Sequence, residues 1–223
     1  MKVKDIIDSW KNYTNLLQES SLSRVHQHVM EHECAIVSAY RKDPGDTSKC
    51  ADVEQAATPE PDLEKTTEPA LQINRMKSAD LKAYLLSQGY GVTEVVGSYI
   101  ENFSQPTAVE VKEKSLFVVN LKNTDAFKSD IENMGKKFCQ DSVMFIPQGG
   151  KGAYLVGTNN SEFPGLANSV PVGDLKMGKE SEFMTRVGDR PFTTTEGKLE
   201  TYSSLSRLER MAVKAMAKRL IEG

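Results

Sequence analysis

The clearest alternation of hydrophobic and polar positions in this chain lies between residues 74 and 158. Residues 74–89 place their leucines on one helical face and end at Gly89, a residue that commonly ends helices. Residues 125–140 repeat the helical spacing. Shorter runs rich in β-branched and aromatic residues predict strands at 34–40, 90–101, 115–121, 141–147 and 153–158.

In chain order, the first six predicted elements read strand, helix, strand, strand, helix, strand. That order is the split β-α-β pattern of ferredoxin-like folds. A glycine-rich turn at residues 149–152 predicts that the seventh element, 153–158, forms a hairpin with the strand before it. The expected fold class is α+β: a ferredoxin-like β-α-β-β-α-β core with an extra hairpin strand, in which helices back a mainly antiparallel sheet.

Amphipathic segments predict a helix at each end of the chain, at residues 1–19 and, capped by Ser204, at residues 203–223. Residues 42–70 are rich in proline, threonine and acidic residues, which predicts disorder. After residue 158 the sequence predicts irregular structure with a short strand or helix at 182–187. The predicted organisation is an N-terminal helix or propeptide at 1–19, one α+β domain at 20–202 with a disordered acidic insertion at 42–70, and a basic C-terminal helix at 203–223.

Composition narrows the class of protein. The chain has 223 residues, of which 39% are hydrophobic, and this suffices for one packed core. No apolar run approaches the roughly 20 residues that a membrane-spanning helix needs. The formal net charge of -3 argues against a surface that coats nucleic acid over its whole extent. The three cysteines, Cys34, Cys50 and Cys139, lack metal-binding spacing, which predicts reduced thiols in a cytosol-like compartment.

Polar residues gather near the ends of the predicted strands and form a candidate polar rim. Its carboxylates could perform acid–base chemistry or hold a divalent cation, and the whole set could line a polar pocket. Solvated carboxylates and helix caps are the alternative. No base and nucleophile occur at a recognisable spacing, so no catalytic residue is assigned. The rim residues are Tyr99, Glu101, Glu113, Ser115, Gln140 and Asp141.

A second candidate lies in the histidine-rich stretch before the first strand. Residues His28 to His32 match the pattern His-x-x-Glu-His. On a helix, His28 and His32 lie one turn apart and could share a metal ion, with Glu31 as the base, as in inverted zinc peptidases. A solvated polar helix is the alternative.

A third candidate is the basic face of the predicted C-terminal helix, which carries Arg207, Arg210, Lys214 and Lys218. Such a face can bind nucleic acid, an anionic surface or a partner groove. An ordinary solvated helix face is the alternative.

The N-terminal segment carries a resemblance of its own. The helix at 1–19 ends in Leu17-Gln18-Glu19, and Ser20 follows. It resembles the capsid-targeting propeptides of internal head proteins in large tailed phages. The resemblance implies that a maturation protease cuts between Glu19 and Ser20.

Short motifs in the core carry a second resemblance. They are Ala35–Arg41 ahead of Pro44, Asn74-Arg75, Gly97–Glu101, Glu113–Ser115 and Phe138–Ser142. In this order they resemble an uncharacterised domain family of bacteria and their phages, over roughly residues 30–158. The insertion at 42–70 is longer than that pattern, and Cys139 stands where glycine is more usual. The resemblance implies a fold and no chemistry.

Together these observations favour a non-enzymatic phage protein, packaged in the virion or directed at a host component. It would bind a capsid or host protein, or nucleic acid, and no membrane, in the virion or the host cytoplasm, without a cofactor. One alternative is a small metal-dependent hydrolase or nuclease with a divalent metal ion. The other is a nucleic-acid-binding module that uses the C-terminal basic helix.

Overall fold

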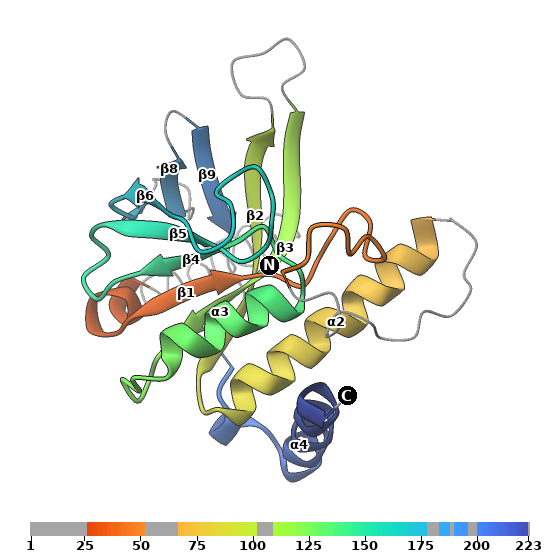
Figure 1. The fold of residues 1–223 in the computed structure, drawn as a ribbon. Helices are drawn as coiled ribbons and strands as arrows, with labels where there is room; N and C mark the ends of the chain where they lie inside the picture. Colours follow the sequence, from red (N-terminus) through yellow and green to blue (C-terminus); the bar gives the residue numbers. More distant parts are fainter. Residues whose placement is uncertain are drawn as a thin grey trace, which may run out of the picture.

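The computed structural model describes residues 26–51, 67–101, 109–177, 183–187, 190–195 and 200–222 (Figure 1). Within these residues, strands assemble into one sheet in the order β6-β5-β4-β1-β3-β2-β9-β8-β7, and every neighbouring pair is antiparallel. The strands are β1 (Cys34–Val37), β2 (Gly91–Glu101), β3 (Val109–Val119), β4 (Ser142–Ile146), β5 (Ala153–Gly157), β6 (Ser169–Gly173), β7 (Lys176–Met177), β8 (Phe183–Val187) and β9 (Arg190–Thr195). The fold class is therefore α+β, as predicted.

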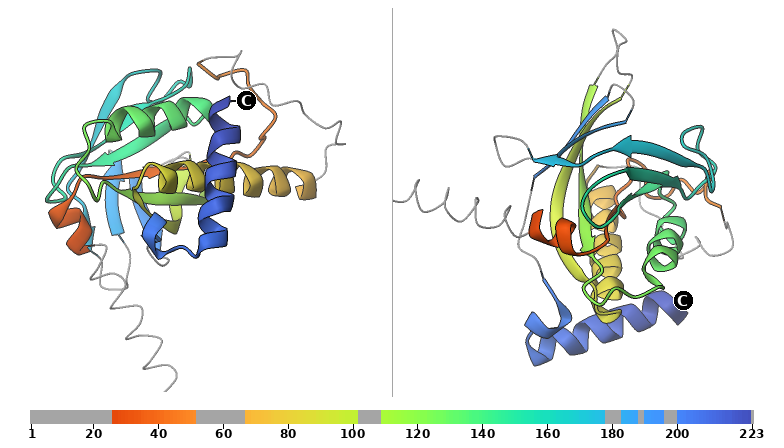
Figure 2. Two further views of the ribbon diagram at one scale, coloured as in Figure 1. Left: turned by 90° about the horizontal axis from the view of Figure 1, so that it is seen from below. Right: turned by 90° about the vertical axis from the view of Figure 1, so that its left-hand side faces the viewer.

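Helices α2 (Thr67–Ser87) and α3 (Phe127–Lys137) cover one face of this sheet (Figures 1 and 2). Helix α3 has its apolar residues at Phe127, Ile131 and Met134, a spacing that places them on one face, and all three are buried. Leucines of α2 meet them in a single core cluster with Leu116 and Val118 of β3. The helices are thus held to the sheet by burial of their apolar stripes.

Strand β3 shows why the sheet is buried on both faces. Leu116 and Val118 belong to the cluster under the helices, whereas Phe117 and Val119 belong to a second cluster on the opposite face. Alternate residues of a strand point to opposite faces, so a continuous apolar run is required here. The predicted burial of this strand on both faces is confirmed.

The boundaries of several elements differ from those predicted. Helix α2 begins at Thr67, seven positions before the predicted start, and β3 begins at Val109 rather than Ser115. The hairpin of β4 and β5 is confirmed. Residues after 158 are more regular than predicted, because β6 and β9 add to strands already in the sheet. Pairing with a neighbouring strand gives order to short segments whose own sequence pattern is weak.

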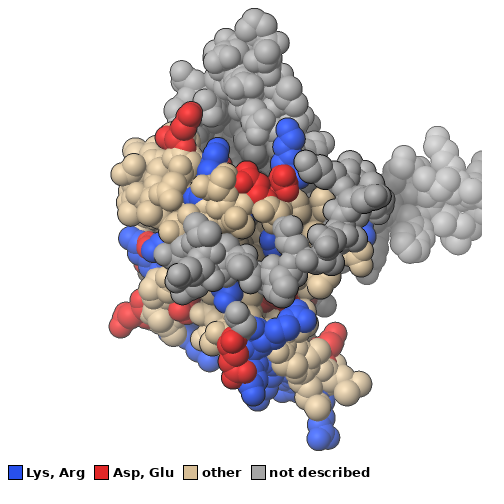
Figure 3. Space-filling model, turned by 45° about the vertical axis from the view of Figure 1, so that its right-hand side comes forward, with Lys and Arg blue, Asp and Glu red and all other residues tan. Residues whose placement is uncertain are grey.

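Helix α4 (Arg207–Glu222) closes the chain and follows a short 3-10 helix, η1 (Tyr202–Ser204). The predicted cap at Ser204 is wrong, because Ser204 pairs with Thr201 in the capping box of η1. Ser206 caps α4 instead: the backbone N–H of Glu209 donates to its hydroxyl at 3.3 Å. Lys and Arg side chains gather on the part of the surface that α4 forms (Figure 3). The predicted helix at 1–19 and its processing residues Leu17, Glu19 and Ser20 lie outside the described residues.

The predicted disordered insertion is partly ordered. Residues 42–51 form turns, and residues 67–70 belong to α2, whereas residues 52–66 lie outside the described part of the chain. We call residues 40–50 the strap. It ends in a disulfide between Cys50 and Cys139, so the prediction of reduced thiols is wrong for these two residues. Sequence spacing could not reveal the pair, because the fold brings together positions 89 residues apart.

Candidate functional site

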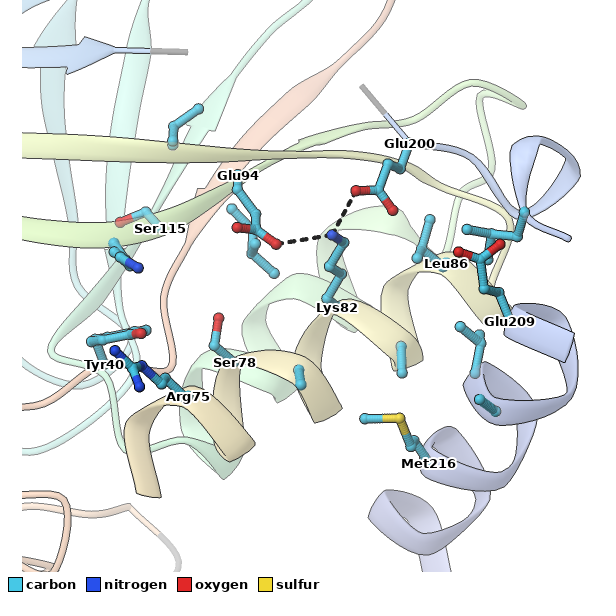
Figure 4. Close-up of a pocket in the computed structure, with 18 residues that line it drawn as sticks. Tyr40, Arg75, Ser78, Lys82, Leu86, Glu94, Ser115, Glu200, Glu209 and Met216 are labelled. Carbon is cyan, nitrogen blue, oxygen red and sulfur yellow. Dashed lines mark hydrogen bonds and ion pairs between the residues drawn. The ribbon is translucent and has the colours of Figure 1, made fainter. Parts of the chain in front are cut away.

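A cavity of about 790 Å³ lies between α2, the β2–β3 pair and α4 (Figure 4). Helix α2 supplies Arg75, Ser78 and Lys82, which follow one another at helical spacing and so share a face. Apolar side chains line the space between α2 and α4. They are Leu86, Leu116, Leu205, Val213 and Met216.

Lys82 forms the centre of the polar part of the cavity. Its Nζ lies 2.9 Å from Oε1 of Glu94 and 2.7 Å from Oε1 of Glu200. Burial alone would lower the pKa of Lys82, but the hydrogen bonds and charges of Glu200 and Glu94 outweigh burial and raise that pKa above its ordinary value. One ammonium therefore holds two carboxylates side by side in the cavity wall.

Glu200 reaches the cavity from a distant part of the chain. Its backbone pairs with that of Val92 in β2: the N–H of Val92 donates to the Glu200 carbonyl at 2.7 Å, and the Glu200 N–H donates in return at 2.6 Å. This isolated bridge fixes the backbone of Glu200 against the sheet. Its carboxylate then meets the ammonium of Lys82.

The cavity has differently charged ends. Tyr40 and Arg75 lie together at one end, and Glu209 and Met216 lie at the other, beside α4 (Figure 4). Lys114 also lines the cavity, and its backbone carbonyl accepts a hydrogen bond from the Ser38 hydroxyl at 2.8 Å. Cations and carboxylates are thus both present, as a ligand with charges of both signs requires.

Helix α4 forms the outer wall and is tied to the rest of the fold by polar contacts. Arg219 pairs with Asp80 of α2, and Lys137 of α3 donates to the backbone carbonyl of Leu220. Ala217 is buried, and Val213 and Leu220 pack against the main core cluster. The wall is therefore an integral part of the fold.

The structure separates the predicted polar rim into two groups. Backbone register places Gly97 opposite Glu113 and Tyr99 opposite Val111. Positions 99, 101 and 113 therefore share one face of the β2–β3 pair with Ser115. Ser115 is buried and lines the cavity.

The other two rim residues belong to the turn between α3 and β4. Gln140 is buried, and its Nε2 donates to the backbone carbonyl of Tyr40 at 3.3 Å. Asp141 accepts a hydrogen bond from Nδ2 of Asn159 at 2.8 Å. These contacts hold the turn, and Gln140 reaches the cavity only through the backbone of Tyr40.

The histidine candidates lie on a short helical stretch, residues 26–31, and at its end. The ring centroids of His28 and His32 are 6.0 Å apart, and Glu31 accepts a hydrogen bond from Gln27 at 2.9 Å. No group of three His, Cys, Asp or Glu side chains arranged to hold a metal ion occurs among the described residues. The structure thus gives no support to a metal centre built on His28, Glu31 and His32.

The basic candidates on α4, Arg207, Arg210, Lys214 and Lys218, are all exposed, and Lys218 lies 3.7 Å from Glu222. No observation tests a nucleic-acid or protein partner for them, and it stays a prediction. None of the helices in the described ranges is long and apolar enough to span a membrane.

Sequence reasoning missed the cavity residues Lys82, Glu94 and Glu200. One signal was available: Glu94 is a charged residue next to the apolar pair Val95-Val96, which is unusual within a central strand. Glu200 gave no signal, because only the tertiary pairing with Val92 brings it to the cavity.

Comparison with known proteins adds a family. The family model described as the S-Adenosylmethionine lyase family matches residues 66–205, which include α2, β2, β3 and Glu200. No curated protein matches the chain. The match overturns the predicted resemblance to an uncharacterised domain family, and with it the prediction of a non-enzymatic phage or internal head protein, because the matched family is one of enzymes. Four of the five short motifs behind that resemblance lie within residues 66–205, the part of the chain that the enzyme family's model matches.

Proposed function

Because the chain belongs to the S-adenosylmethionine lyase family, we propose that it is an enzyme that cleaves S-adenosylmethionine without adding water. The family match over residues 66–205 is the observation that carries this proposal. The cavity beside Lys82 is the proposed substrate site.

The substrate's own chemistry limits the reaction. S-adenosylmethionine has a positively charged sulfonium, an ammonium and a carboxylate. Positive sulfur makes its carbon neighbours electrophilic and leaves as a neutral thioether. In one route, the substrate carboxylate attacks the side-chain carbon bonded to sulfur; a C–O bond forms, the C–S bond breaks, and homoserine lactone and methylthioadenosine result. In the other route, a base removes a proton from the adjacent carbon, the same C–S bond breaks, and vinylglycine forms with methylthioadenosine.

The charges of the cavity suit this substrate. The carboxylates of Glu94, Glu200 and Glu209 can meet its ammonium and sulfonium, and the cations of Arg75 and Lys114 can meet its carboxylate. The phenol ring of Tyr40 offers a surface for the adenine ring. The volume of about 790 Å³ lies within the usual range for small-molecule sites.

The apolar wall has a chemical role in the first route. Carboxylate and sulfonium neutralise one another as the C–O bond forms, so the transition state is less charged than the bound substrate. Exclusion of water by Leu86, Leu116, Val213 and Met216 therefore favours the transition state over the ground state. It also keeps the carboxylate close to the carbon that it attacks.

The β2–β3 positions of the predicted rim are a second candidate location for catalytic groups. Tyr99, Glu101 and Glu113 lie within the matched residues, and the strand register supports their placement on one face. An acid or base among them would serve the elimination route, which needs a proton acceptor.

Two finer structural statements accompany this proposal. We propose that the core is ferredoxin-like, supported by the order β4-β1-β3-β2 and by the helices α2 and α3 at the expected places in the chain. We also propose that residues 20–202 form one domain, with the shared core cluster as support.

Product analysis of the purified full-length protein tests the function. We expect methylthioadenosine together with either the lactone or vinylglycine, and no label from isotopically labelled water in the products as first released. Absence of S-adenosylmethionine cleavage, or incorporation of label during cleavage, would refute a lyase.

Charge-removing variants test the location. Glu94→Gln and Glu200→Gln each remove one charge-assisted contact, so we expect kcat/KM to fall by about 10- to 150-fold. Glu162→Gln is the matched control, because Glu162 is exposed and is not among the cavity residues. A fully active Glu94→Gln variant beside an inactive Glu113→Gln variant would move the site to the β2–β3 positions.

A further inference from the structure

The strap forms one end of the proposed substrate cavity. Tyr40, its first residue, lines the cavity next to Arg75. The neighbouring residue Arg41 is clamped to α2 by Asn74: the Arg41 N–H donates to Oδ1 of Asn74 at 3.1 Å, and Nδ2 of Asn74 donates to the Arg41 carbonyl at 2.8 Å. Asn74 directly precedes Arg75. The position of the strap therefore affects two cavity residues, Tyr40 and Arg75.

The rest of the strap is tied at the turn after α3. Cys50 is bonded to Cys139, and Cys50 also forms a β-bridge with Asn159. The carbonyl of Cys139 accepts hydrogen bonds from the Arg41 guanidinium and, at 3.2 Å, from Nδ2 of Asn159. One residue, Cys139, thus anchors both ends of the strap, through its sulfur at Cys50 and through its carbonyl at Arg41.

The disulfide is the only covalent tie in this group of contacts, and it lies below an exposed stretch. Cys50 is 3% exposed and Cys139 is 5% exposed, whereas Lys42 and Lys49 of the strap are exposed. A reductant can therefore reach the sulfurs when the strap opens locally. The third cysteine, Cys34, does not exchange with this disulfide. Burial, aided by the charge of Glu33, raises the pKa of its thiol far above the ordinary value, so the reactive thiolate does not form.

We propose that the Cys50–Cys139 disulfide is a redox-sensitive cross-link that holds the strap against α2 and thereby keeps Tyr40 and Arg75 in place for substrate binding. The inference rests on the proposed function for its substrate. In the oxidised protein the strap is fixed and S-adenosylmethionine binds well. In the reduced protein the strap loosens and binding weakens.

The switching step is thiol–disulfide exchange with a dithiol. One thiolate of the dithiol attacks a sulfur of the pair, the S–S bond breaks, and a mixed disulfide forms. The second thiolate of the dithiol then displaces the protein sulfur. Two electrons pass to the protein, two protons complete the thiols of Cys50 and Cys139, and the dithiol leaves as a cyclic disulfide.

The test compares oxidised full-length protein with protein reduced by dithiothreitol, and alkylation with mass measurement establishes the redox state of each. On reduction, we expect KM for S-adenosylmethionine to rise about tenfold with a smaller change in kcat, because the binding residues are displaced. We also expect faster trypsin cleavage at Lys42 and Lys49 in the reduced protein. The Cys50→Ser variant should match reduced protein and respond no further to dithiothreitol. The Cys139→Gly variant should also match reduced protein. Glycine suits the positive φ of 53° at position 139, so this variant removes the disulfide and preserves the turn.

Equal KM values and equal cleavage rates in fully oxidised and fully reduced protein would overturn the inference and leave the lyase proposal standing. Faster cleavage of the strap with an unchanged KM would also overturn it, because the strap would not control the cavity. If neither form cleaves S-adenosylmethionine, the proposed function fails. The dissociation constant of each form for S-adenosylmethionine then decides the inference: weaker binding by the reduced form supports it, and equal or absent binding overturns it.

Discussion

Breaking the Cys50–Cys139 disulfide should lower the free energy of unfolding by an amount that depends on how many residues separate the two cysteines. The two cysteines are 89 residues apart, so the bond closes a large loop in the unfolded chain. The chain-entropy relation gives a loss of about 4.6 kcal/mol at 25 °C for a loop of this size. That is a large part of the stability of a typical domain, so the effect is measurable without difficulty.

The position of Cys139 allows a more discriminating comparison. Its φ of 53° is left-handed, a conformation that costs a non-glycine residue about 1 kcal/mol relative to glycine. Cys50→Ser and Cys139→Gly both remove the disulfide, but only Cys139→Gly also relieves this backbone cost. Cys139→Gly should therefore be the more stable of the two variants by about 1 kcal/mol.

Urea denaturation followed by circular dichroism measures both effects, with wild-type protein in the presence and absence of dithiothreitol. We expect reduced wild-type protein to resemble Cys50→Ser and both to unfold at lower urea than oxidised protein. The slope of free energy against urea should rise on reduction, because the unfolded chain is then less compact. A loss below about 1 kcal/mol on complete reduction, or a Cys139→Gly variant less stable than Cys50→Ser, would refute the reasoning.

Three further predictions concern polar side chains in or beside the core. Lys82→Met should lower the free energy of unfolding by about 1 kcal/mol at pH 8, a modest value because Glu94 is exposed and Glu200 is partly exposed. The pKa of Lys82 is raised in the folded protein, so its ion pairs stabilise the fold fully below the pKa of Lys82 in the unfolded chain, and this stability is lost as pH rises through the folded-state pKa. In an alkaline titration, wild-type protein should lose this stability and the Lys82→Met variant should not. Equal losses in the two proteins would contradict the prediction. Thr93→Val should raise the free energy of unfolding by about 1 kcal/mol in urea titration, because Thr93 is fully buried and its hydroxyl has no hydrogen-bond partner among the described residues; a destabilised variant would argue for a hidden partner. Tyr90→Phe should lower it by about 2 kcal/mol, because the Tyr90 hydroxyl donates to the Asp130 carboxylate at 2.7 Å, and an unchanged urea midpoint would show that this bond contributes nothing.

Sequence pattern predicted the central elements well because they bury regular apolar stripes. Phe127, Ile131 and Met134 repeat at helical spacing and are all buried, and the run from Leu116 to Val119 is divided between the two core clusters. Elements without such stripes were misjudged. The first turns of α2 and strands β6 and β9 depend on neighbours that the local sequence does not specify.

The candidate site was harder to predict, because its members are joined by the fold rather than by spacing. Lys82 meets Glu94 across a helix–sheet contact, and Glu200 arrives through a single backbone bridge to Val92. The same holds for Cys50 and Cys139. The chain has three cysteines, an odd number without metal-binding spacing, and this predicted free thiols, whereas the fold pairs two of them. Sequence motifs identify functional residues that lie within one segment, whereas the residues of this cavity come from several segments.

The boundaries of the family match divide the cavity wall into two parts with different expected roles. Arg75, Lys82, Glu94, Lys114 and Glu200 lie inside the matched residues 66–205, whereas Tyr40 and the residues of α4 lie outside them. Groups required for the reaction itself belong where the family pattern is, because every member must perform the same bond cleavage. The strap and α4 shape the ends of the cavity, so they are the places where this chain can adjust its affinity for substrate without altering the chemistry. A control that acts on the strap, such as reduction of its disulfide, therefore affects binding first and bond cleavage second.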